Sequence, residues 1–290
     1  MDKRETIEAA LARLSDGMTI GIGGWATRRK PMALVRAIAQ SNLKDLTVVS
    51  FGGPDVGLLA AAGKLRKLVF AFVSLDQYPL DPHFRAAREA GLPVFELDEG
   101  LLHWGLRAAA MKLPFLPSRV GAGTDLLRQD GFGTVKSPFA DGETLVAMPA
   151  IKLDAALLHV HRADARGNTV TLSADPFFDE LMARAADTVI VSSERIVDTA
   201  ALDIAAQGPR NLFERALVTS VVEAPFGAHP TSASPDYPLD LEHLKTYIEA
   251  AGSPEAWTGY RSGYVDLDPA AYLAAVGGAA RVSALPAVVY

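Results

Sequence analysis

The fold is decided by the stretch Asp16-Gly17-Met18-Thr19-Ile20-Gly21-Ile22-Gly23-Gly24-Trp25. Its apolar centre predicts a buried strand, and the paired glycines that follow predict a tight turn. A helix is expected from Pro31, because proline is tolerated in the first helical turn. A strand, a glycine turn and a helix in this order are typical of an open α/β sheet. At the carboxyl end of such a strand the backbone can approach a ligand closely.

The same alternation continues along the chain. Besides the strand at 18–22, strands are expected at 46–51, 68–73, 94–97, 155–160, 188–191 and 217–222. These apolar runs show little polar alternation, as is typical of parallel strands covered on both faces. Helices are expected at 31–39, 54–62, 82–90 and 100–111. The pattern predicts an α/β fold with an open, mainly parallel sheet and helices on both faces, in a single domain spanning residues 1–290.

Two segments interrupt this pattern. Glycine and proline crowd residues 114–149, where no helix or strand period is visible. A stretch of this length without regular structure is more often functional than idle. Residues 225–238 form a second segment that resembles a loop.

Composition excludes several classes of protein. The net charge is −6 with both signs scattered along the chain, so no basic run is available to follow the phosphates of a nucleic acid. Cysteine is absent, which excludes disulfides, thiolate metal sites and a cysteine nucleophile. The N-terminus is charged, and no apolar run approaches the roughly 18 residues that span a bilayer. We therefore expect a cytoplasmic protein without membrane or nucleic-acid partners.

Two glycine turns are the first candidate binding elements. Gly52-Gly53-Pro54 ends the second expected strand just as Gly23-Gly24 ends the first. Because neighbouring parallel strands end at the same edge of a sheet, the two turns predict one shared ligand-binding edge. The alternative is that each glycine pair only permits a tight turn. A dinucleotide site is not indicated, since Ala26 occupies the third glycine position of that fingerprint.

A basic cluster, Arg28-Arg29-Lys30, follows the first turn. Such clusters are usually solvated. Next to a glycine turn, however, the cluster could bind phosphates or a carboxylate, for which arginine offers a bidentate fork.

Charged residues also follow later strands. Asp98 and Glu99 come directly after the fourth expected strand, where a carboxylate commonly caps a helix or stabilises its first turn. Glu99 could instead be a catalytic carboxylate, provided that burial raises its pKa.

Arg119 lies in a proline-rich loop and could either aim its guanidinium at a ligand or form a structural ion pair. His159 and His161 are two apart in an expected strand, so both would point to one face and could bind a metal. No third ligand in a recognised pattern accompanies them, which favours a structural or interface role.

As a set, the motifs resemble the α subunits of class I CoA-transferases. The resemblance covers roughly the first four-fifths of the chain. It rests on Asp16-Gly17 through Trp25, Lys30-Pro31, Gly52-Gly53-Pro54, Asp98-Glu99-Gly100, Leu113-Pro114-Phe115-Leu116-Pro117, Glu143-Thr144-Leu145, Met148-Pro149-Ala150, Gly167-Asn168, Asp175-Pro176 and 223–229. Tryptophan at position 25 replaces the phenylalanine that is usual in the family.

Within the family, the chain is most similar to the α subunits of steroid ring-cleaving acyl-CoA hydrolases, through Trp25 to Pro31, Phe72 to Asp76 and the Glu99 turn. The resemblance implies hydrolytic C–C cleavage that opens the last ring of a steroid-derived CoA thioester. Coenzyme A would be part of the substrate, and no other cofactor or metal is expected. The partner would be a β-type subunit, in a heterodimer or an α2β2 assembly. A CoA-transferase subunit and a non-catalytic scaffold subunit are the alternatives.

The resemblance also implies roles for particular residues. Glu99 would be the catalytic base, and the oxyanions formed in the reaction would be stabilised by Arg119 or by the backbone N–H groups of Gly23 and Gly24. The candidate substrate-binding residues are Gly23, Gly24, Trp25, Arg28, Gly52 and Gly53. True transferases use the glutamate of a Ser-Glu-Asn-Gly motif on the β-type chain. The sequence here reads Ser193-Glu194-Arg195, so this chain alone is not expected to be a complete transferase.

Overall fold

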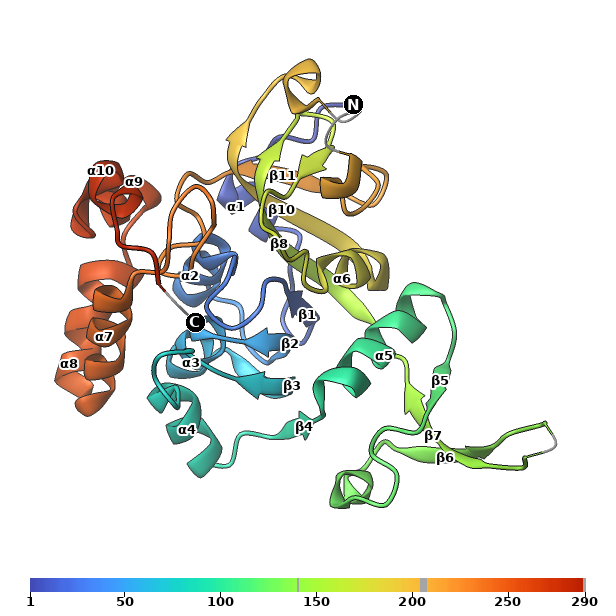
Figure 1. The fold of residues 1–290 in the computed structure, drawn as a ribbon. Helices are drawn as coiled ribbons and strands as arrows, with labels where there is room; N and C mark the ends of the chain where they lie inside the picture. Colours follow the sequence, from blue (N-terminus) through green and yellow to red (C-terminus); the bar gives the residue numbers. More distant parts are fainter. Residues whose placement is uncertain (140, 204–207, 289–290) are drawn as a thin grey trace.

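The computed structural model describes residues 1–139, 141–203 and 208–288. Its main sheet has the strand order β11-β10-β8-β1-β2-β3-β4, and each neighbouring pair in this path is parallel (Figure 1). A short strand, β9 (Thr169–Val170), pairs with β8 in the antiparallel sense. The strands of the path are β1 (Thr19–Ile22), β2 (Leu46–Gly52), β3 (Leu65–Val73), β4 (Val94–Glu96), β8 (Leu153–Ala163), β10 (Ala186–Ile196) and β11 (Ser220–Glu223).

Each strand expected from the sequence lies in this sheet, so the predicted fold class is confirmed. β2 is buried along its whole length, which explains its continuous apolar run. Alternate residues enter two separate cores: Val48 packs on one face of the sheet and Val49 on the other.

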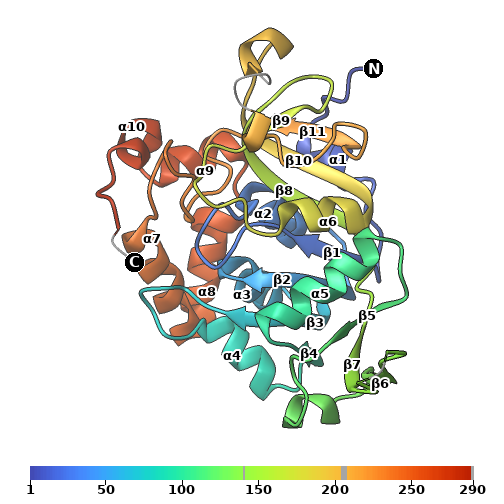
Figure 2. The same ribbon diagram turned by 45° about the vertical axis from the view of Figure 1, so that its right-hand side comes forward.

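Helices cover both faces, as predicted (Figure 2). On the Val48 face lie α1 (Ile7–Leu11), α2 (Met32–Gln40), α3 (Pro54–Ala61) and α4 (Pro82–Glu89). On the Val49 face lie α5 (Glu99–Ala110) and α6 (Asp179–Ala185). Pro54 and Pro82 occupy the first turns of α3 and α4, where their missing N–H groups cost nothing.

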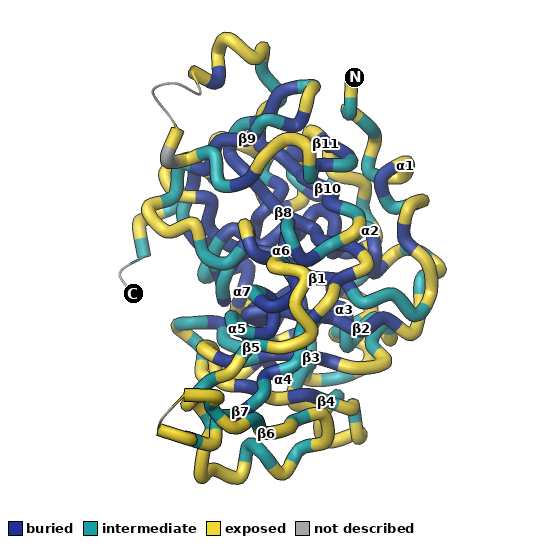
Figure 3. Tube along the Cα trace, turned by 90° about the vertical axis from the view of Figure 1, so that its right-hand side faces the viewer, coloured by how far each residue is buried: buried dark blue, intermediate teal, exposed yellow. Residues whose placement is uncertain are grey.

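Residues 114–149 do contain regular structure, contrary to the expectation. Within the described segments they form a sheet in the order β5-β7-β6, built from β5 (Phe115–Ser118), β6 (Gly133–Lys136) and β7 (Thr144–Pro149). This sheet extends away from the main one and is largely exposed (Figures 1 and 3). Its strands are short and half-exposed, so they leave no continuous apolar run for a sequence pattern to detect.

The C-terminal part adds helices that were not expected from the sequence. They are α7 (Leu241–Glu249), α8 (Pro254–Tyr260), α9 (Pro269–Ala275) and α10 (Gly278–Ser283). They are joined to β11 by residues 225–238, which contain no helix or strand beyond isolated bridges, as predicted for a loop. None of the helices in the described ranges combines the length and apolarity needed to cross a membrane.

The N-terminal segment closes one end of the main sheet. Val221 of β11 donates a backbone hydrogen bond to Lys3 at 2.8 Å, and Glu5 donates one to Val221 at 2.9 Å. Arg4 therefore pairs with Val221 as a parallel bridge. The outer edge of β11 is covered by main chain from the other end of the sequence.

Candidate active site

The strand order of the main sheet reverses at β1. The strands that follow β1 in sequence, β2 to β4, lie on one side of it, whereas β8, β10 and β11 lie on the other. β1 and β8 are therefore neighbours at the point where the strand order reverses, which is where a crevice forms in an open α/β sheet. In open α/β sheets this crevice is the usual place for a ligand.

The turn after β1 packs directly against the turn after β2. Gly24 has a φ of +74°, and a Cβ atom there would lie 2.4 Å from the Arg28 carbonyl oxygen. At Gly53 a Cβ atom would lie 1.9 Å from the Ala26 carbonyl oxygen. The Ala26 N–H also donates to the Phe51 carbonyl at 3.1 Å. The two glycine pairs share one edge, as predicted. Gly24 permits a close approach within its own turn, and Gly53 permits contact between the backbones of the two turns.

The backbone N–H groups of the first glycine pair are already used within the chain. Gly23 donates to the Leu157 carbonyl at 2.9 Å, and Gly24 donates to Asp179 Oδ1 at 2.9 Å. An oxyanion hole needs donors that are directed at the ligand. The expectation that these two N–H groups stabilise an oxyanion is therefore wrong. The prediction that the glycines of the two turns contact substrate in another way stays a prediction.

Arg28 is the member of the basic cluster that reaches the crevice. Its guanidinium carbon lies 4.9 Å from the centre of the Trp25 ring. One guanidinium nitrogen forms an ion pair with Asp76 at 3.2 Å. The side chain is partly buried by these contacts, and it is held where a negatively charged ligand group could meet it.

The other two basic residues of the cluster point into the protein. Arg29 forms a buried ion pair with Asp179, and Lys30 Nζ lies 3.3 Å from Asp55 Oδ2. Burial lowers the pKa of Lys30, although the nearby Asp55 carboxylate opposes that shift. The interpretation of Arg28-Arg29-Lys30 as a solvated charge run is therefore wrong for two of its three members.

Glu99 is the first residue of α5, and its neighbour supplies the helix cap. The Asp98 side chain accepts a hydrogen bond from the Leu101 N–H at 2.6 Å, so the predicted capping role belongs to Asp98. The Glu99 carboxylate turns instead toward the loop after β1, where its Oε1 accepts a hydrogen bond from Trp25 Nε1 at 3.1 Å. Glu99 is exposed, contrary to the burial that a catalytic role led us to expect.

A pocket of about 390 Å³ connects these residues. Its walls are formed by Trp25, Arg28, Glu99, Asp175, Phe177 and Phe178. The planes of the Trp25 and Phe177 rings lie only 7° apart, with 6.4 Å between their centres. The structure thus brings three of the predicted site residues, Trp25, Arg28 and Glu99, into one pocket that combines aromatic walls with two carboxylates and a guanidinium.

The wall contributed by residues 175–178 was missed as a site. Phe177 has a φ of +55°, in a turn where the Asp175 side chain accepts a hydrogen bond from the Phe177 N–H at 2.7 Å. A positive φ at a phenylalanine cannot be read from sequence. The available signal was the pair of phenylalanines between a proline and an amphipathic helix.

Comparison with known proteins gives the family. The family described as Coenzyme A transferase matches residues 4–223. The chain belongs to the coenzyme A transferase family. Family relatives include the cholesterol ring-cleaving hydrolase IpdA subunits of Rhodococcus jostii and Mycobacterium tuberculosis. They are 48% and 47% identical to this chain over 95% of its length, and over 96% and 97% of their own.

Solved structures of the family share the fold. Glutaconate coenzyme A-transferase from Acidaminococcus fermentans superposes with a TM-score of 0.91 at 28% identity, covering 99% of this chain and 96% of that one. The decarboxylase AibA/AibB, solved as a cysteine-to-serine variant, gives a TM-score of 0.80 at 33% identity and covers 90% of this chain and 98% of the other.

Arg119 lies outside the pocket of this coenzyme A transferase family member. It follows β5 on the projecting sheet, and its side chain is 78% exposed. Its guanidinium binds both oxygens of the Glu143 carboxylate, at 2.8 and 2.7 Å, and this contact raises the pKa of Arg119. The ion pair agrees with the structural alternative, and a catalytic role for Arg119 stays a prediction.

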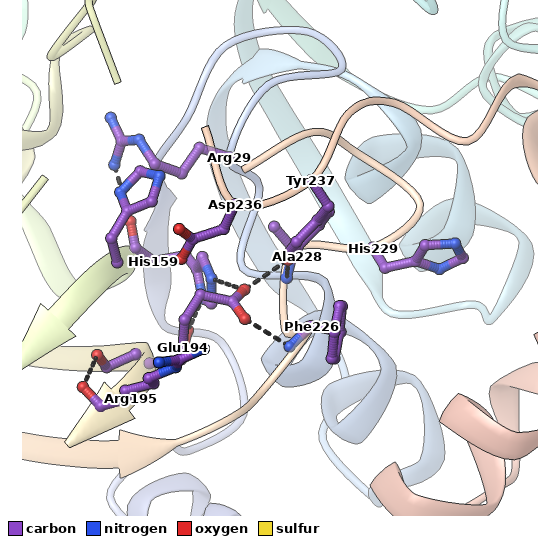
Figure 4. Close-up of polar contacts among 12 residues, drawn as sticks. Arg29, His159, Glu194, Arg195, Phe226, Ala228, His229, Asp236 and Tyr237 are labelled. Carbon is purple, nitrogen blue, oxygen red and sulfur yellow. Dashed lines mark hydrogen bonds and ion pairs between the residues drawn. The ribbon is translucent and has the colours of Figure 1, made fainter. Parts of the chain in front are cut away.

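A second carboxylate, Glu194, lies further along the same sheet edge (Figure 4). It accepts hydrogen bonds from His159 Nε2 at 2.7 Å, from the Phe226 N–H at 2.6 Å and from the Tyr237 hydroxyl. Burial alone would raise the pKa of Glu194, but these donors outweigh burial and hold it below its usual value. His159 is fully buried in this cluster. The structural or interface role predicted for this histidine stays a prediction.

Proposed function

We propose that this chain is the α-type subunit of a heteromeric acyl-CoA hydrolase that opens the last ring of a steroid-derived CoA thioester by C–C cleavage. The observation that carries the proposal is the Glu99 carboxylate, which lines a pocket with aromatic walls and accepts a hydrogen bond from Trp25. The substrate class is supported by the relatives named cholesterol ring-cleaving hydrolase subunits, which match almost end to end.

Glu99 would act as a general base on water. Glu99 takes a proton from the water as its oxygen bonds to a ring ketone that lies β to a second carbonyl. The bond between the attacked carbon and the carbon that lies between the two carbonyl groups then breaks. Its electron pair passes to the carbon next to the second carbonyl as an enolate, while the attacked carbon becomes a carboxylic acid. Protonated Glu99 returns its proton to the enolate carbon, so one water is consumed and the base is restored.

The pocket walls suit such a substrate. The parallel Trp25 and Phe177 rings offer apolar faces to a carbocyclic ring. Arg28 is the pocket's guanidinium and would stabilise the negative charge that builds on a carbonyl oxygen during the attack. We retain Arg119 as a second candidate for this role, from a position that a bound partner or substrate would have to bring nearer. Coenzyme A enters as part of the substrate.

The partner is expected to be a β-type subunit. Glu99 is exposed in this chain, whereas a general base acts best where bulk water is excluded. The family relatives are named as subunits, which supports a second chain that covers this face.

CoA transfer is the second candidate function, because glutaconate coenzyme A-transferase superposes over almost the whole chain. The sequence of the partner separates the two functions. A Ser-Glu-Asn-Gly glutamate there would favour transfer between a thioester and a free acid. If neither reaction depended on Glu99, this chain would be a scaffold for the partner's site.

The test is Glu99→Gln in the co-expressed heteromer, assayed by steady-state turnover of a ring-intact steroid-derived CoA thioester. Glutamine keeps the shape but cannot accept a proton, so turnover should fall by at least about a hundredfold while thioester binding persists. Asp98→Asn is the matched control, because it neutralises the adjacent carboxylate and asparagine still caps a helix. Unchanged turnover in a well-folded Glu99→Gln heteromer would end the proposal that this chain supplies the base.

A further inference from the structure

We infer that Arg29 is a positioning residue that holds the two walls of the pocket together. The inference rests on the proposed function for its catalytic consequence, but not for its geometry. Trp25 and Arg28 come from the turn after β1, whereas Phe177 and Phe178 come from the turn before α6. About 150 residues separate the two turns in sequence, so their spacing depends on tertiary contacts.

Toward the first wall, Arg29 acts through Asp179. The guanidinium Nη1 binds Asp179 Oδ2, and Asp179 Oδ1 accepts the Gly24 N–H at 2.9 Å. Gly24 directly precedes Trp25, whose indole donates to Glu99. Gly23 leaves room for the Asp179 carboxylate, since a Cβ atom at this position would lie 2.7 Å from Asp179 Oδ1.

Toward the second wall, Arg29 makes direct contacts. Its Nη2 donates to the Pro176 carbonyl at 3.1 Å. Its guanidinium carbon lies 5.2 Å from the centre of the Phe177 ring, within the range of a cation–π contact. A third bond, from Nη1 to the His159 carbonyl at 2.8 Å, fixes the guanidinium to β8 (Figure 4). The guanidinium therefore contacts the second turn, α6 and β8 directly, and it reaches the first turn through Asp179.

Placing the Arg29 guanidinium in the interior is energetically unfavourable. Both side chains of the Arg29–Asp179 pair are only 1% exposed, and the buried Arg29 Nε has no hydrogen-bond partner among the described residues. Arg29 also has a φ of +51°, which a side-chain-bearing residue rarely adopts. Unpaired buried donors and strained backbone persist mainly where the surroundings over-determine them, as they do at functional sites.

The fork geometry of the guanidinium allows a substitution to distinguish a positioning role for Arg29 from simple neutralisation of the Asp179 charge. A lysine at position 29 could neutralise Asp179, but as a single point charge it could not also bind the Pro176 and His159 carbonyls in the same plane. If Arg29 serves only to neutralise Asp179, Arg29→Lys should keep both stability and turnover. If Arg29 positions the walls, Arg29→Lys should keep most of the stability but lose turnover.

The experiment uses the co-expressed heteromer. Arg29→Lys is expected to lower kcat by about one to two decades, the usual effect of misplacing a site by roughly 1 Å, with a smaller change in KM. The double variant Arg29→Met/Asp179→Asn removes both charges of the buried pair, and asparagine still offers an acceptor to the Gly24 N–H, so the protein should fold yet stay slow. Arg162→Met is the control, because Arg162 also binds a carbonyl and a carboxylate, those of His161 and Asp236, away from the pocket.

A second readout does not depend on turnover. In a Trp104→Phe/Trp257→Phe background, Trp25 is the remaining tryptophan of the three in the chain. Arg29→Lys should then increase acrylamide quenching of Trp25 and shift its emission to longer wavelength, whereas Arg162→Met should change neither. Unchanged quenching in Arg29→Lys would overturn the positioning role, whatever the reaction is. Changed quenching alongside an active Glu99→Gln heteromer would keep the positioning role and remove the proposed function.

Discussion

Gly53→Ala tests whether contact between the two glycine turns is required for the pocket. The new Cβ atom would lie 1.9 Å from the Ala26 carbonyl oxygen and 2.7 Å from its carbonyl carbon. Both neighbouring atoms belong to the backbone, so no side-chain rotation relieves the overlap. The turns would have to move apart by roughly 1.5 Å to restore an ordinary van der Waals distance.

The structure allows the cost to be worked out. Separating the turns would break the 3.1 Å hydrogen bond from Ala26 to Phe51, which is worth about 1 kcal/mol. Forced repacking of a filled interior adds about 1–3 kcal/mol. The free energy of unfolding should therefore fall by about 2–4 kcal/mol. Because Ala26 adjoins Trp25, the same displacement should lower kcat by about a hundredfold.

The assay is a thermal melt followed by circular dichroism, run beside turnover of the co-expressed heteromer. Gly259→Ala is the matched control, since its Cβ atom would meet open space within α8 and should leave stability unchanged or slightly higher. A Gly53→Ala protein that melted and turned over like the wild type would refute the argument that the two backbones must touch.

Three further outcomes are expected. Burial raises the pKa of Asp81 to about 6, so ionisation of Asp81 lowers the free energy of unfolding as the pH rises from about 4 to 6. Asp81→Asn cannot ionise and keeps a partner for Tyr247. In urea unfolding, the variant should be more stable than the wild type by about 3 kcal/mol at pH 8 and no more stable below pH 4. Tyr237→Phe removes a donor from Glu194, whose pKa is lowered in the folded protein, so a loss of about 1–3 kcal/mol at pH 7 should shrink in acid. The chain purified alone should lack turnover and should form a complex with a co-expressed β-type subunit in light scattering; an active homo-oligomer would contradict this.

The main sheet could be predicted from the sequence because its strands are buried on both faces. Burial of that kind leaves a continuous apolar run in the chain, and β2 is the plainest case. The sheet formed by β5, β6 and β7 has no such run, and β5 and β7 contain the prolines Pro117 and Pro149. A pattern of alternating burial this weak cannot be separated from loop by periodicity.

The candidate site was predicted in part, for a similar reason. Trp25, Arg28 and Glu99 follow strands whose ends can be read from the sequence, so their common edge could be inferred. Phe177 and Asp179 act through contacts with residues far away in the chain, and the pair of phenylalanines at 177–178 is a weak local signal for them. Arg29 is the clearest example of what the sequence does not reveal. Its neighbours in sequence suggest a solvated cluster, whereas its side chain is buried in an ion pair with Asp179.

The pairing of Lys3 to Glu5 with β11 has a consequence for handling this protein. An uncovered outer strand presents free N–H and C=O groups, to which a second molecule can add its own strand. Here residues of the N-terminal segment occupy those groups on Val221. Trimming or proteolysis that removes them would expose the unpaired backbone groups of β11 as an edge strand. Copies of the chain would then self-associate through β11. A larger species seen after such cleavage would report the damaged edge and would say nothing about the natural assembly.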